Sequence, residues 1–219
     1  METPRSRRPI TLGSYRLGEA IGQGAFARVF RADGPSGPVA IKLLKRPGRF
    51  SCRQLRREID LLRALPRGLV GVAGYVDSGD TPAGTPWLAM KLIEGYSLRD
   101  AMARGPLPET SVRRLGIQLC SALNALHRLG VVHCDPKPDN ILLDPVARTV
   151  HLIDLGLASD AQGVLRVMQT EQLMAGEQFL GVGTERFLAG TPRWMAPEQL
   201  VNALSEGAAR YHLATQTTI

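Results

Sequence analysis

Residues 133–140 constrain the fold and chemistry of this sequence more than any other stretch, because they read His-Cys-Asp-Pro-Lys-Pro-Asp-Asn. Two prolines and several side chains that hydrogen-bond to nearby backbone predict a rigid loop there, not a helix or a strand. The apolar residues 141–143 follow, and ten residues later comes Ile153-Asp-Leu-Gly156. A loop of this kind can hold a carboxylate, an amine and an amide within a few ångströms of one another.

Phosphoryl transfer suits such a loop, because that reaction needs mainly positioning and the neutralisation of dispersed negative charge. Asp135 could accept a hydroxyl proton, and Lys137 could contact the transferring phosphate. Asn140 and Asp154 could hold Mg²⁺ through hard oxygen ligands. An ordinary turn rich in Asp and Asn is the alternative for either piece alone.

Two earlier motifs fit the same chemistry. Gly22-Gln-Gly-Ala-Phe-Ala27 lies between two predicted strands, where small residues let backbone N–H groups approach an anion, although a glycine turn in a hairpin explains it equally well. Lys42 lies within a predominantly apolar strand and needs an anionic partner if it is buried. Glu58, on the helix that follows, is the available carboxylate; a snorkelling lysine and a surface glutamate are the alternative.

Hydrophobic periodicity divides the chain into a strand-rich part and a helix-rich part that meet near residues 94–96. Strands are predicted at residues 15–21, 28–31, 39–44, 72–77 and 86–93, and helices at 55–65, 97–105 and 109–129. Residues 1–14, rich in Pro, Arg and Ser, are predicted to be disordered. A crevice between two unlike lobes is a natural place for a ligand.

Six elements occur in the order and approximate spacing of the eukaryotic-type protein kinase catalytic domain, which residues 15–198 resemble. The elements are Gly22 to Val29, Val39 to Lys42, Glu58, residues 133–140, Asp154 to Gly156 and Ala196-Pro-Glu198. Lys137 and residues 190–198 resemble the Ser/Thr branch, and bacterial Ser/Thr kinases most closely. The resemblance implies an α+β, two-lobed fold: a five-stranded antiparallel N-lobe with one helix over residues 15–93, and an incomplete helical C-lobe over 94–219.

The resemblance also implies ATP and Mg²⁺ as cofactors and a protein Ser or Thr hydroxyl as acceptor. Gly22 and Gly24 would cover the phosphates, and Glu58 would hold Lys42 on them, while Thr191 would hydrogen-bond Asp135. Ile21, Val29, Ala40 and Leu142 would enclose the adenine, with Met90 as gatekeeper and the backbone of Lys91 and Ile93 on the base edge. His133 would be structural.

Three positions depart from the family pattern. Ala27 replaces the third glycine of the phosphate loop, and Leu155 replaces a phenylalanine beside the metal aspartate. Cys134 stands where the family commonly has an arginine that pairs with a phosphate on the activation segment, so the sequence gives no support for activation at Thr170 or Thr184. The segment between Gly156 and Ala196 is long and is predicted to be mobile.

Only 21 residues follow Glu198, whereas the family continues through several more helices. The sequence therefore reads as C-terminally truncated, either a fragment of a longer kinase or a natural short form. A truncated pseudokinase that serves as a nucleotide-binding or scaffold module is the alternative function. A small-molecule kinase of the aminoglycoside type shares a similar loop but gives no reason for residues 191–198.

Composition narrows the remaining possibilities. Three cysteines without a C-x-x-C pair argue against a disulfide framework or a zinc site. Residues 42–67 hold nine cationic side chains and two acidic ones, but Phe50 is the only aromatic there, so a solvated helix face is expected and nucleic acid is not. No apolar run reaches membrane-spanning length and no signal peptide precedes the fold, so a cytoplasmic location is expected. The oligomeric state is not readable.

Overall fold

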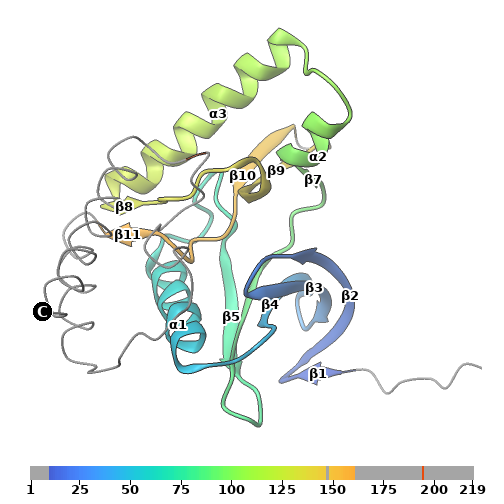
Figure 1. Cartoon of the computed structure of the whole chain (residues 1–219), viewed down its shortest axis with the longest axis vertical. Coiled ribbons are helices and arrows are strands. Elements are labelled where there is room, and N and C mark those ends of the chain that lie inside the picture. Colours follow the sequence, from blue (N-terminus) through green and yellow to red (C-terminus); the bar gives the residue numbers. More distant parts are fainter. Residues whose placement is uncertain (1–9, 147, 161–193, 195–219) are drawn as a thin grey trace, which may run out of the picture. The chain divides into compact units, whose positions relative to one another are not determined.

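A computed structural model describes residues 10–146, 148–160 and 194 of the 219-residue chain (Figure 1). The chain divides into two compact units. The first consists of Met1–Tyr96 and Leu142–Gly156, and the second of Ser97–Ile141 and Leu157–Ile219. Thr191 and the motif at 196–198 lie outside the described residues, as does almost all of the segment predicted to be mobile.

A curled antiparallel sheet dominates the first unit (Figure 1). Its strands follow the order β1-β2-β3-β4-β6-β5. Their bounds are β1 Thr11–Leu12, β2 Tyr15–Gln23, β3 Ala27–Gly34, β4 Gly37–Leu44, β5 Tyr75–Asp80 and β6 Pro86–Lys91. All five neighbouring pairs are antiparallel, so hairpins connect most of the sheet.

The five strands predicted from the sequence are present, with boundaries that differ by up to three residues. The predicted strand at 72–77 starts three residues later, at Tyr75. Val72 instead forms an isolated parallel bridge with Leu152, and the backbone N–H of Ala73 donates to Leu152 O at 3.0 Å. This segment therefore uses its backbone groups on residues far away in sequence, which local propensity cannot reveal.

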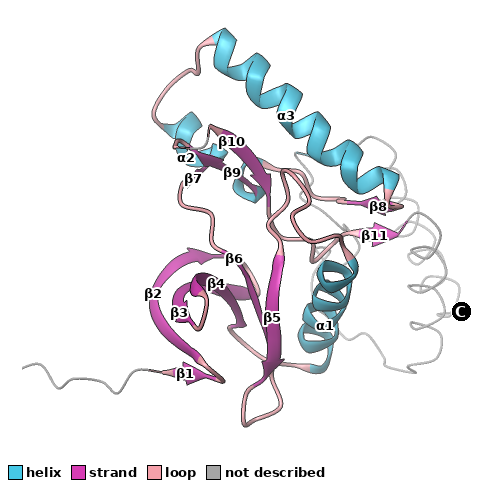
Figure 2. Cartoon of the chain, turned by 180° about the vertical axis from the view of Figure 1, so that it is seen from behind, coloured by secondary structure: helices cyan, strands magenta, loops and turns pink. Residues whose placement is uncertain are grey.

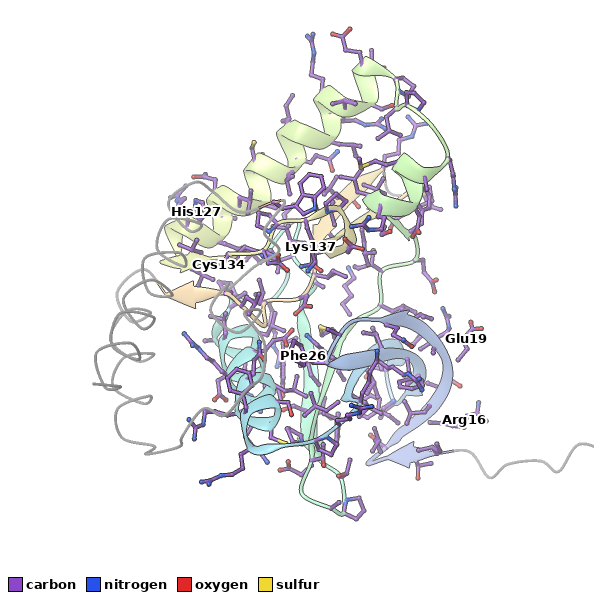
Figure 3. The ribbon with its side chains drawn as sticks, in the orientation of Figure 1. Arg16, Glu19, Phe26, His127, Cys134 and Lys137 are labelled. Atoms are coloured by element: carbon purple, nitrogen blue, oxygen red, sulfur yellow. The ribbon has the colours of Figure 1, made fainter. Side chains whose placement is uncertain are left out.

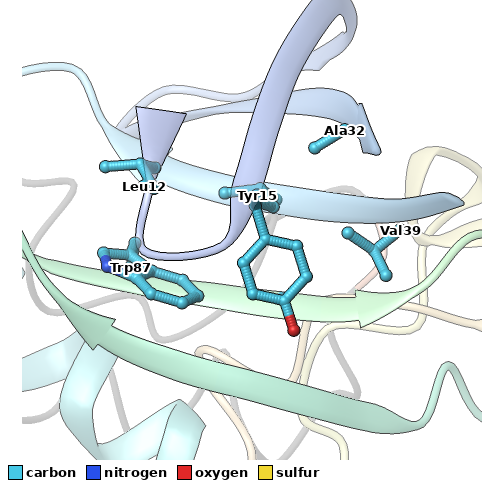
Figure 4. Close-up of a cluster of buried hydrophobic side chains, with 7 residues drawn as sticks. Leu12, Tyr15, Ala32, Val39 and Trp87 are labelled. Atoms are coloured by element: carbon cyan, nitrogen blue, oxygen red, sulfur yellow. The ribbon is translucent and has the colours of Figure 1, made fainter. Parts of the chain in front are cut away.

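β1 is a sixth strand that the sequence did not predict. Residues 10–14 were expected to be disordered, and this expectation is wrong, whereas residues 1–9 lie outside the described part of the chain. Leu12 is 7% exposed and belongs to a cluster of buried side chains (Figure 4). The cluster comprises Leu12, Tyr15, Ala32, Val39, Ile41, Trp87 and Ala89. Burial of the Leu12 side chain stabilises the pairing of this short strand with β2.

Tyr15 and Trp87 form the aromatic centre of that cluster. Their ring centroids lie 5.6 Å apart with an interplanar angle of 66°, an edge-to-face contact (Figure 4). Tyr15 starts β2 and Trp87 lies in β6, so the contact joins strands that are not neighbours in the sheet. The curl of the sheet seen in Figure 1 allows residues of separated strands to meet in this cluster.

Helix α1, Arg49–Ala64, packs against β5 and β6. It buries Leu55, Glu58, Ile59 and Leu62 in one stripe, and Pro66 follows the C-cap residue Leu65. The stripe agrees with the predicted amphipathic helix, which begins six residues earlier than expected. The arginines of α1 are exposed, so its cationic excess lies on the solvated face.

A second, three-stranded sheet has the order β10-β9-β7. Its strands are β7 Tyr96–Ser97, β9 Ile141–Asp144 and β10 Thr149–Leu152. Gly95 comes so close to β9 that a Cβ built on it would lie 2.0 Å from the backbone oxygen of Leu143. A glycine is therefore required at this position by packing, since the clash is with backbone and not with a flexible side chain.

The second unit contains the longest helix, α3, Glu109–Arg128 (Figure 2). The other elements of this unit, among the residues that the structure describes, are α2 Leu98–Ala103, β8 Val131–Val132, the 3-10 turn η1 Pro138–Asn140 and β11 Ser159–Asp160. Ser97 caps α2 and Gly130, at φ 75°, follows α3, as the sequence predicted. No helix in the described ranges is both long and apolar enough to cross a membrane.

Candidate functional site

Lys42 is held between two carboxylates of the first unit. Its Nζ lies 2.9 and 2.7 Å from the two carboxylate oxygens of Glu58 and 2.8 Å from Oδ1 of Asp154. The side chains of Lys42 and Glu58 are 12% and 2% exposed, whereas that of Asp154 is 45% exposed. We call Lys42, Glu58 and Asp154 the lysine cluster. It carries a net negative charge and is open at Asp154.

The neighbouring secondary structure explains why these charges meet. Lys42 lies opposite Leu88 in the β4–β6 ladder and follows the buried residues Val39, Ala40 and Ile41. Glu58 belongs to the buried stripe of α1, which packs on β6. Strand and helix thus present their charged groups to each other inside the same core, where an unpaired charge would be costly.

Burial and charge act in opposite directions on Lys42. Burial lowers the pKa of the Lys42 ammonium, but the carboxylates of Glu58 and Asp154 outweigh it and raise that pKa above its ordinary value. Burial raises the pKa of Glu58, and the Lys42 ammonium opposes this change. Lys42 is therefore a fixed cation at every physiological pH, which suits it to pairing with an anion.

Asp154 is placed by a tight backbone turn that also needs Gly156. Asp154 has φ 64°, a left-handed conformation that Asp tolerates better than most residues. The Gly156 N–H donates to its Oδ1 at 3.2 Å, and Gln54 Nε2 donates to Gly156 O at 3.1 Å. A Cβ on Gly156 would lie 3.0 Å from Asp154 Oδ1 and 3.3 Å from Glu58 Oε2, so glycine lets both carboxylates approach.

The glycine turn between β2 and β3 is closed by backbone contacts. The Gly24 N–H donates to Ala27 O at 3.0 Å, and Lys45 Nζ donates to Gly24 O at 2.6 Å. Phe26, labelled in Figure 3, is 62% exposed at the tip. Gly22 pairs with Val29 across the strands, and a Cβ there would make only ordinary contacts.

The residues that the resemblance assigned to the adenine all lie in the first unit. Ala40 and Met90 are cross-strand partners and both are buried. Val29, Ile93 and Leu142 are half-buried, Ile21 is 46% exposed and Lys91 is exposed. The Lys91 N–H already donates to Gly74 O at 2.8 Å, so this N–H is not free to meet a base edge.

A second group of charged and polar side chains lies in the loop between β8 and β9, in the segment that carries Cys134 and Lys137 in Figure 3. Lys137 Nζ donates to Asp135 Oδ2 at 2.6 Å. Asn140 Nδ2 donates to the same oxygen at 3.1 Å and to the Asp135 backbone oxygen at 3.0 Å. Asp135 and Asn140 are 6% exposed. We call Asp135, Lys137 and Asn140 the loop cluster.

His133 and Cys134 shape the loop. His133 is 1% exposed, and its Nδ1 accepts a hydrogen bond from the Asp135 N–H at 3.3 Å, so the ring proton lies on Nε2. Cys134 has φ 63°, which turns the chain between the two residues. Its Sγ donates to Val132 O at 3.5 Å. A buried imidazole held in this way supports the loop backbone, in keeping with the structural role expected for His133.

Both clusters offer oxygen ligands of the kind that a magnesium ion prefers. Because Nδ2 of Asn140 donates twice to Asp135, its amide oxygen is the atom able to bind a cation. Asp154 supplies a carboxylate that is nearly half exposed. Each group by itself therefore has the donor chemistry that the predicted metal requires. Among the described residues there is no group of three His, Cys, Asp or Glu side chains that could hold a metal by themselves.

An ion pair between α2 and η1 in the second unit was not predicted from the sequence. Arg99 of α2 contacts both carboxylate oxygens of Asp139, with Nη2 to Oδ2 at 2.7 Å and a second, shorter bond from Nε to Oδ1. Asp139 lies inside the loop motif, but no feature of the sequence indicates Arg99, 40 residues earlier, as its partner.

Comparisons with known proteins find one matching family and several relatives. Residues 15–212 match the family described as "Protein kinase domain". CBL-interacting protein kinase 24 of Oryza sativa subsp. japonica is 34% identical over 204 residues, covering 90% of this chain and 40% of that protein. CBL-interacting serine/threonine-protein kinase 9 of Arabidopsis thaliana is 32% identical over 213 residues, covering 94% and 43%.

A bacterial relative is equally similar. The probable serine/threonine-protein kinase PkwA of Thermomonospora curvata is 34% identical over 200 residues, covering 84% of this chain and 26% of that protein. The chain thus spans less than half the length of each of these three relatives.

Proposed function

Because the chain belongs to the protein kinase domain family, we propose that it transfers the γ-phosphate of ATP to Ser or Thr hydroxyls of a protein substrate. The observation that carries this proposal is the lysine cluster, in which one buried ammonium is fixed by Glu58 and also contacts Asp154. Three relatives from two plants and one bacterium bear the name of protein kinases. Protein kinases use ATP together with a divalent metal.

Lys42 binds nucleotide phosphate in this proposal. Its ammonium stays protonated because two carboxylates raise its pKa, and Glu58 restricts its position by contacting it through both oxygens. A fixed cation neutralises phosphate charge without having to reorganise during the reaction. Asp154 and the amide oxygen of Asn140 would hold Mg²⁺, which would supply further neutralisation of the phosphates.

Asp135 orients the acceptor hydroxyl and takes its proton. Its carboxylate is fixed by two donors, Lys137 and Asn140, so it cannot rotate freely. Lys137 is 25% exposed and can turn its ammonium from Asp135 to a phosphate oxygen in transit. Thr191, expected to hydrogen-bond Asp135, lies outside the described residues and keeps its predicted role in this proposal.

Ile21, Val29, Ala40, Met90 and Leu142 supply the apolar surfaces for the adenine, and the carbonyl of Lys91 and the backbone of Ile93 supply its polar contacts. Gly22 and Gly24 let the β2–β3 turn approach the phosphates. From the sequence we predict that the substrate is a protein and not a nucleic acid, and that the location is cytoplasmic.

The test is phosphate transfer from radiolabelled Mg-ATP to a generic basic protein. Asp135→Asn keeps the shape of the side chain but removes the base, so transfer should fall by about 10²- to 10⁴-fold while nucleotide affinity is retained. Lys42→Met should remove transfer and weaken nucleotide binding together. Arg113→Gln, at an exposed ion pair on α3, should change neither.

Normal transfer by Asp135→Asn or Lys42→Met would contradict the proposal. A wild-type chain that binds Mg-ATP but transfers no phosphate, even to itself, would instead support a nucleotide-binding scaffold module.

A further inference from the structure

An exposed, two-point ion pair joins helix α2 to the turn η1 in the second unit. Arg99 donates from both Nε and Nη2 to the two oxygens of Asp139, the fork geometry in which guanidinium and carboxylate groups fit best. The two side chains are 57% and 40% exposed. Within the described ranges, Arg99 is the only side chain that hydrogen-bonds Asp139. The proposed function assigns no role to either residue of this pair.

Arg99 projects from a helix turn that is itself fixed. Ser97 Oγ accepts from the Asp100 N–H at 3.0 Å, and Asp100 Oδ2 accepts from the Ser97 N–H at 3.2 Å and from Ser97 Oγ at 2.6 Å. This reciprocal arrangement is a capping box, which restrains the first turn of α2. Ala101 is buried two residues further on. Arg99 therefore acts from a restrained backbone, so its contact can restrain Asp139 in turn.

Asp139 transmits that restraint directly to the loop cluster. It is the middle residue of η1, between the buried residues Pro138 and Asn140. The backbone N–H of Asn140 donates to Lys137 O at 2.9 Å, which closes the turn. The Asn140 side chain then donates to the backbone and side-chain oxygens of Asp135. A displacement of η1 would therefore move the amide that holds the Asp135 carboxylate.

We propose that Arg99 is a positioning residue for phosphoryl transfer: its two-point contact with Asp139 holds η1 in the shape that keeps Asn140 on Asp135. The catalytic part of this inference rests on the proposed function, whereas the restraint on the loop does not. Lys at position 99 would supply charge but only a single point of contact, so it would restore the restraint only in part.

Hydrogen exchange measures the restraint without requiring any activity. Arg99→Gln and Asp139→Asn should each speed exchange of the Asn140 amide severalfold, because the turn that closes on Lys137 O opens more often. Arg99→Lys should fall between the wild type and Arg99→Gln. The matched control is Arg113→Gln, which removes an exposed arginine paired with Glu109 at 3.1 Å on α3 and should leave the exchange of Asn140 unchanged.

Steady-state kinetics then measure the catalytic consequence. Misplacing a catalytic group by a fraction of an ångström lowers turnover, so Arg99→Gln should reduce kcat by about tenfold while KM for ATP stays the same. The charge-swapped double variant, Arg99→Asp with Asp139→Arg, should recover most of both the exchange protection and kcat. If Arg99→Gln acted only by removing a surface charge, the charge-swapped variant would recover neither the exchange protection nor kcat.

The inference is overturned if Arg99→Gln leaves the exchange of Asn140 at the wild-type rate, whatever the activity. It is also overturned if exchange quickens but kcat is unchanged, or if the variant gains activity on arginine-rich peptides, because Asp139 would then be a substrate contact that Arg99 occupies. An inactive wild-type chain with normal Arg99-dependent protection would contradict the proposed function and leave the restraint on the loop supported.

Discussion

The lysine cluster and the loop cluster both hold charged side chains in fixed positions, but they do so by different means. Lys42 meets partners 16 and 112 residues away in sequence, and its closest partner, Glu58, is 2% exposed. Asp135, by contrast, is held by Lys137 and Asn140, two and five residues away. The first cluster depends on the assembled core of a sheet and a helix, and the second on the shape of one short loop.

This difference predicts where mutations act. Breaking a buried ion pair leaves a charge without water or partner, so stability is lost along with function. Breaking a contact within a local loop leaves the surrounding core intact, so function is lost at a smaller cost in stability. Mutation combined with unfolding measurements can test this contrast, beginning with the largest expected effect on stability.

Lys42→Met should lower the free energy of unfolding by about 3 to 5 kcal/mol, because Glu58 would remain buried without its cation. Chemical denaturation of the variant measures the loss. Lys45→Met is the matched control: its ammonium is exposed and bonded to one backbone oxygen, and a change within about 0.5 kcal/mol is expected. Equal stability of Lys42→Met and the wild type would remove the basis of the comparison.

Asn140→Ala should cost less, about 1 to 3 kcal/mol, since it removes two hydrogen bonds to Asp135 while Lys137 still pairs with that carboxylate. Thermal unfolding reports the change in stability. Asn124→Ala on the exposed face of α3 serves as the control and should be close to neutral. A loss as large as that of Lys42→Met would show that the loop, too, is integral to a core.

Gly156→Ala should destabilise by about 1 kcal/mol, because its Cβ would come within 3.0 Å of Asp154 Oδ1, the oxygen that also contacts Lys42. Gly116→Ala offers a control of opposite sign. A Cβ on Gly116 meets nothing within 4 Å, and Ala stabilises a helix interior by about 0.5 to 1 kcal/mol. Differential scanning calorimetry of the two variants should therefore give shifts of Tm in opposite directions. Shifts in the same direction would refute the packing argument.

The smallest effect concerns pH and the Arg99–Asp139 pair. The hydrogen bond from Arg99 lowers the pKa of Asp139 below its ordinary value. Between the lowered pKa of Asp139 in the folded state and its ordinary pKa in the unfolded state, the unfolded state binds more protons than the folded state. The contribution of the pair to stability is therefore present above pH about 4 and is lost as the pH falls through the lowered pKa. The stability gap between wild type and Arg99→Gln should accordingly narrow in acid.

Salt should narrow the same gap at neutral pH, since the pair is exposed and its charges are screened. Denaturation of both proteins across a pH and salt series checks both trends. A gap that stays constant in acid and in high salt would mean that Arg99 contributes through packing and not through charge.

The kinase fold class predicted from the sequence is confirmed by the family match over residues 15–212. Sequence patterns located β2 to β6 and α1 to α3. In α1, helical periodicity succeeds because the helix buries one regular stripe of its own residues. The pairing of Lys42 with Glu58 was also predictable, since both residues lie on core-facing positions of consecutive elements. The catalytic, nucleotide-binding and metal-binding roles of the site residues stay predictions.

Other features could not be predicted because their partners are distant in sequence. β1 consists of two residues, and its formation depends on the burial of Leu12 beside Trp87. Asp154 was expected to hold metal. Its contact with Lys42 depends on its own left-handed backbone conformation, φ 64°, which no sequence pattern predicts. Glycine at 95 is required by the backbone oxygen of Leu143, which approaches from another strand.

The sequence by itself determined which chemical groups are present and which of them are close neighbours along the chain, because loop spacing and side-chain periodicity act over a few residues. Tertiary structure alone decided that Lys42 has two carboxylate partners instead of one, and that Arg99 forms an ion pair with Asp139 in the loop. Such contacts form only when separate elements pack, and a charge is then held by whichever opposite charge the core or the surface brings within hydrogen-bonding distance.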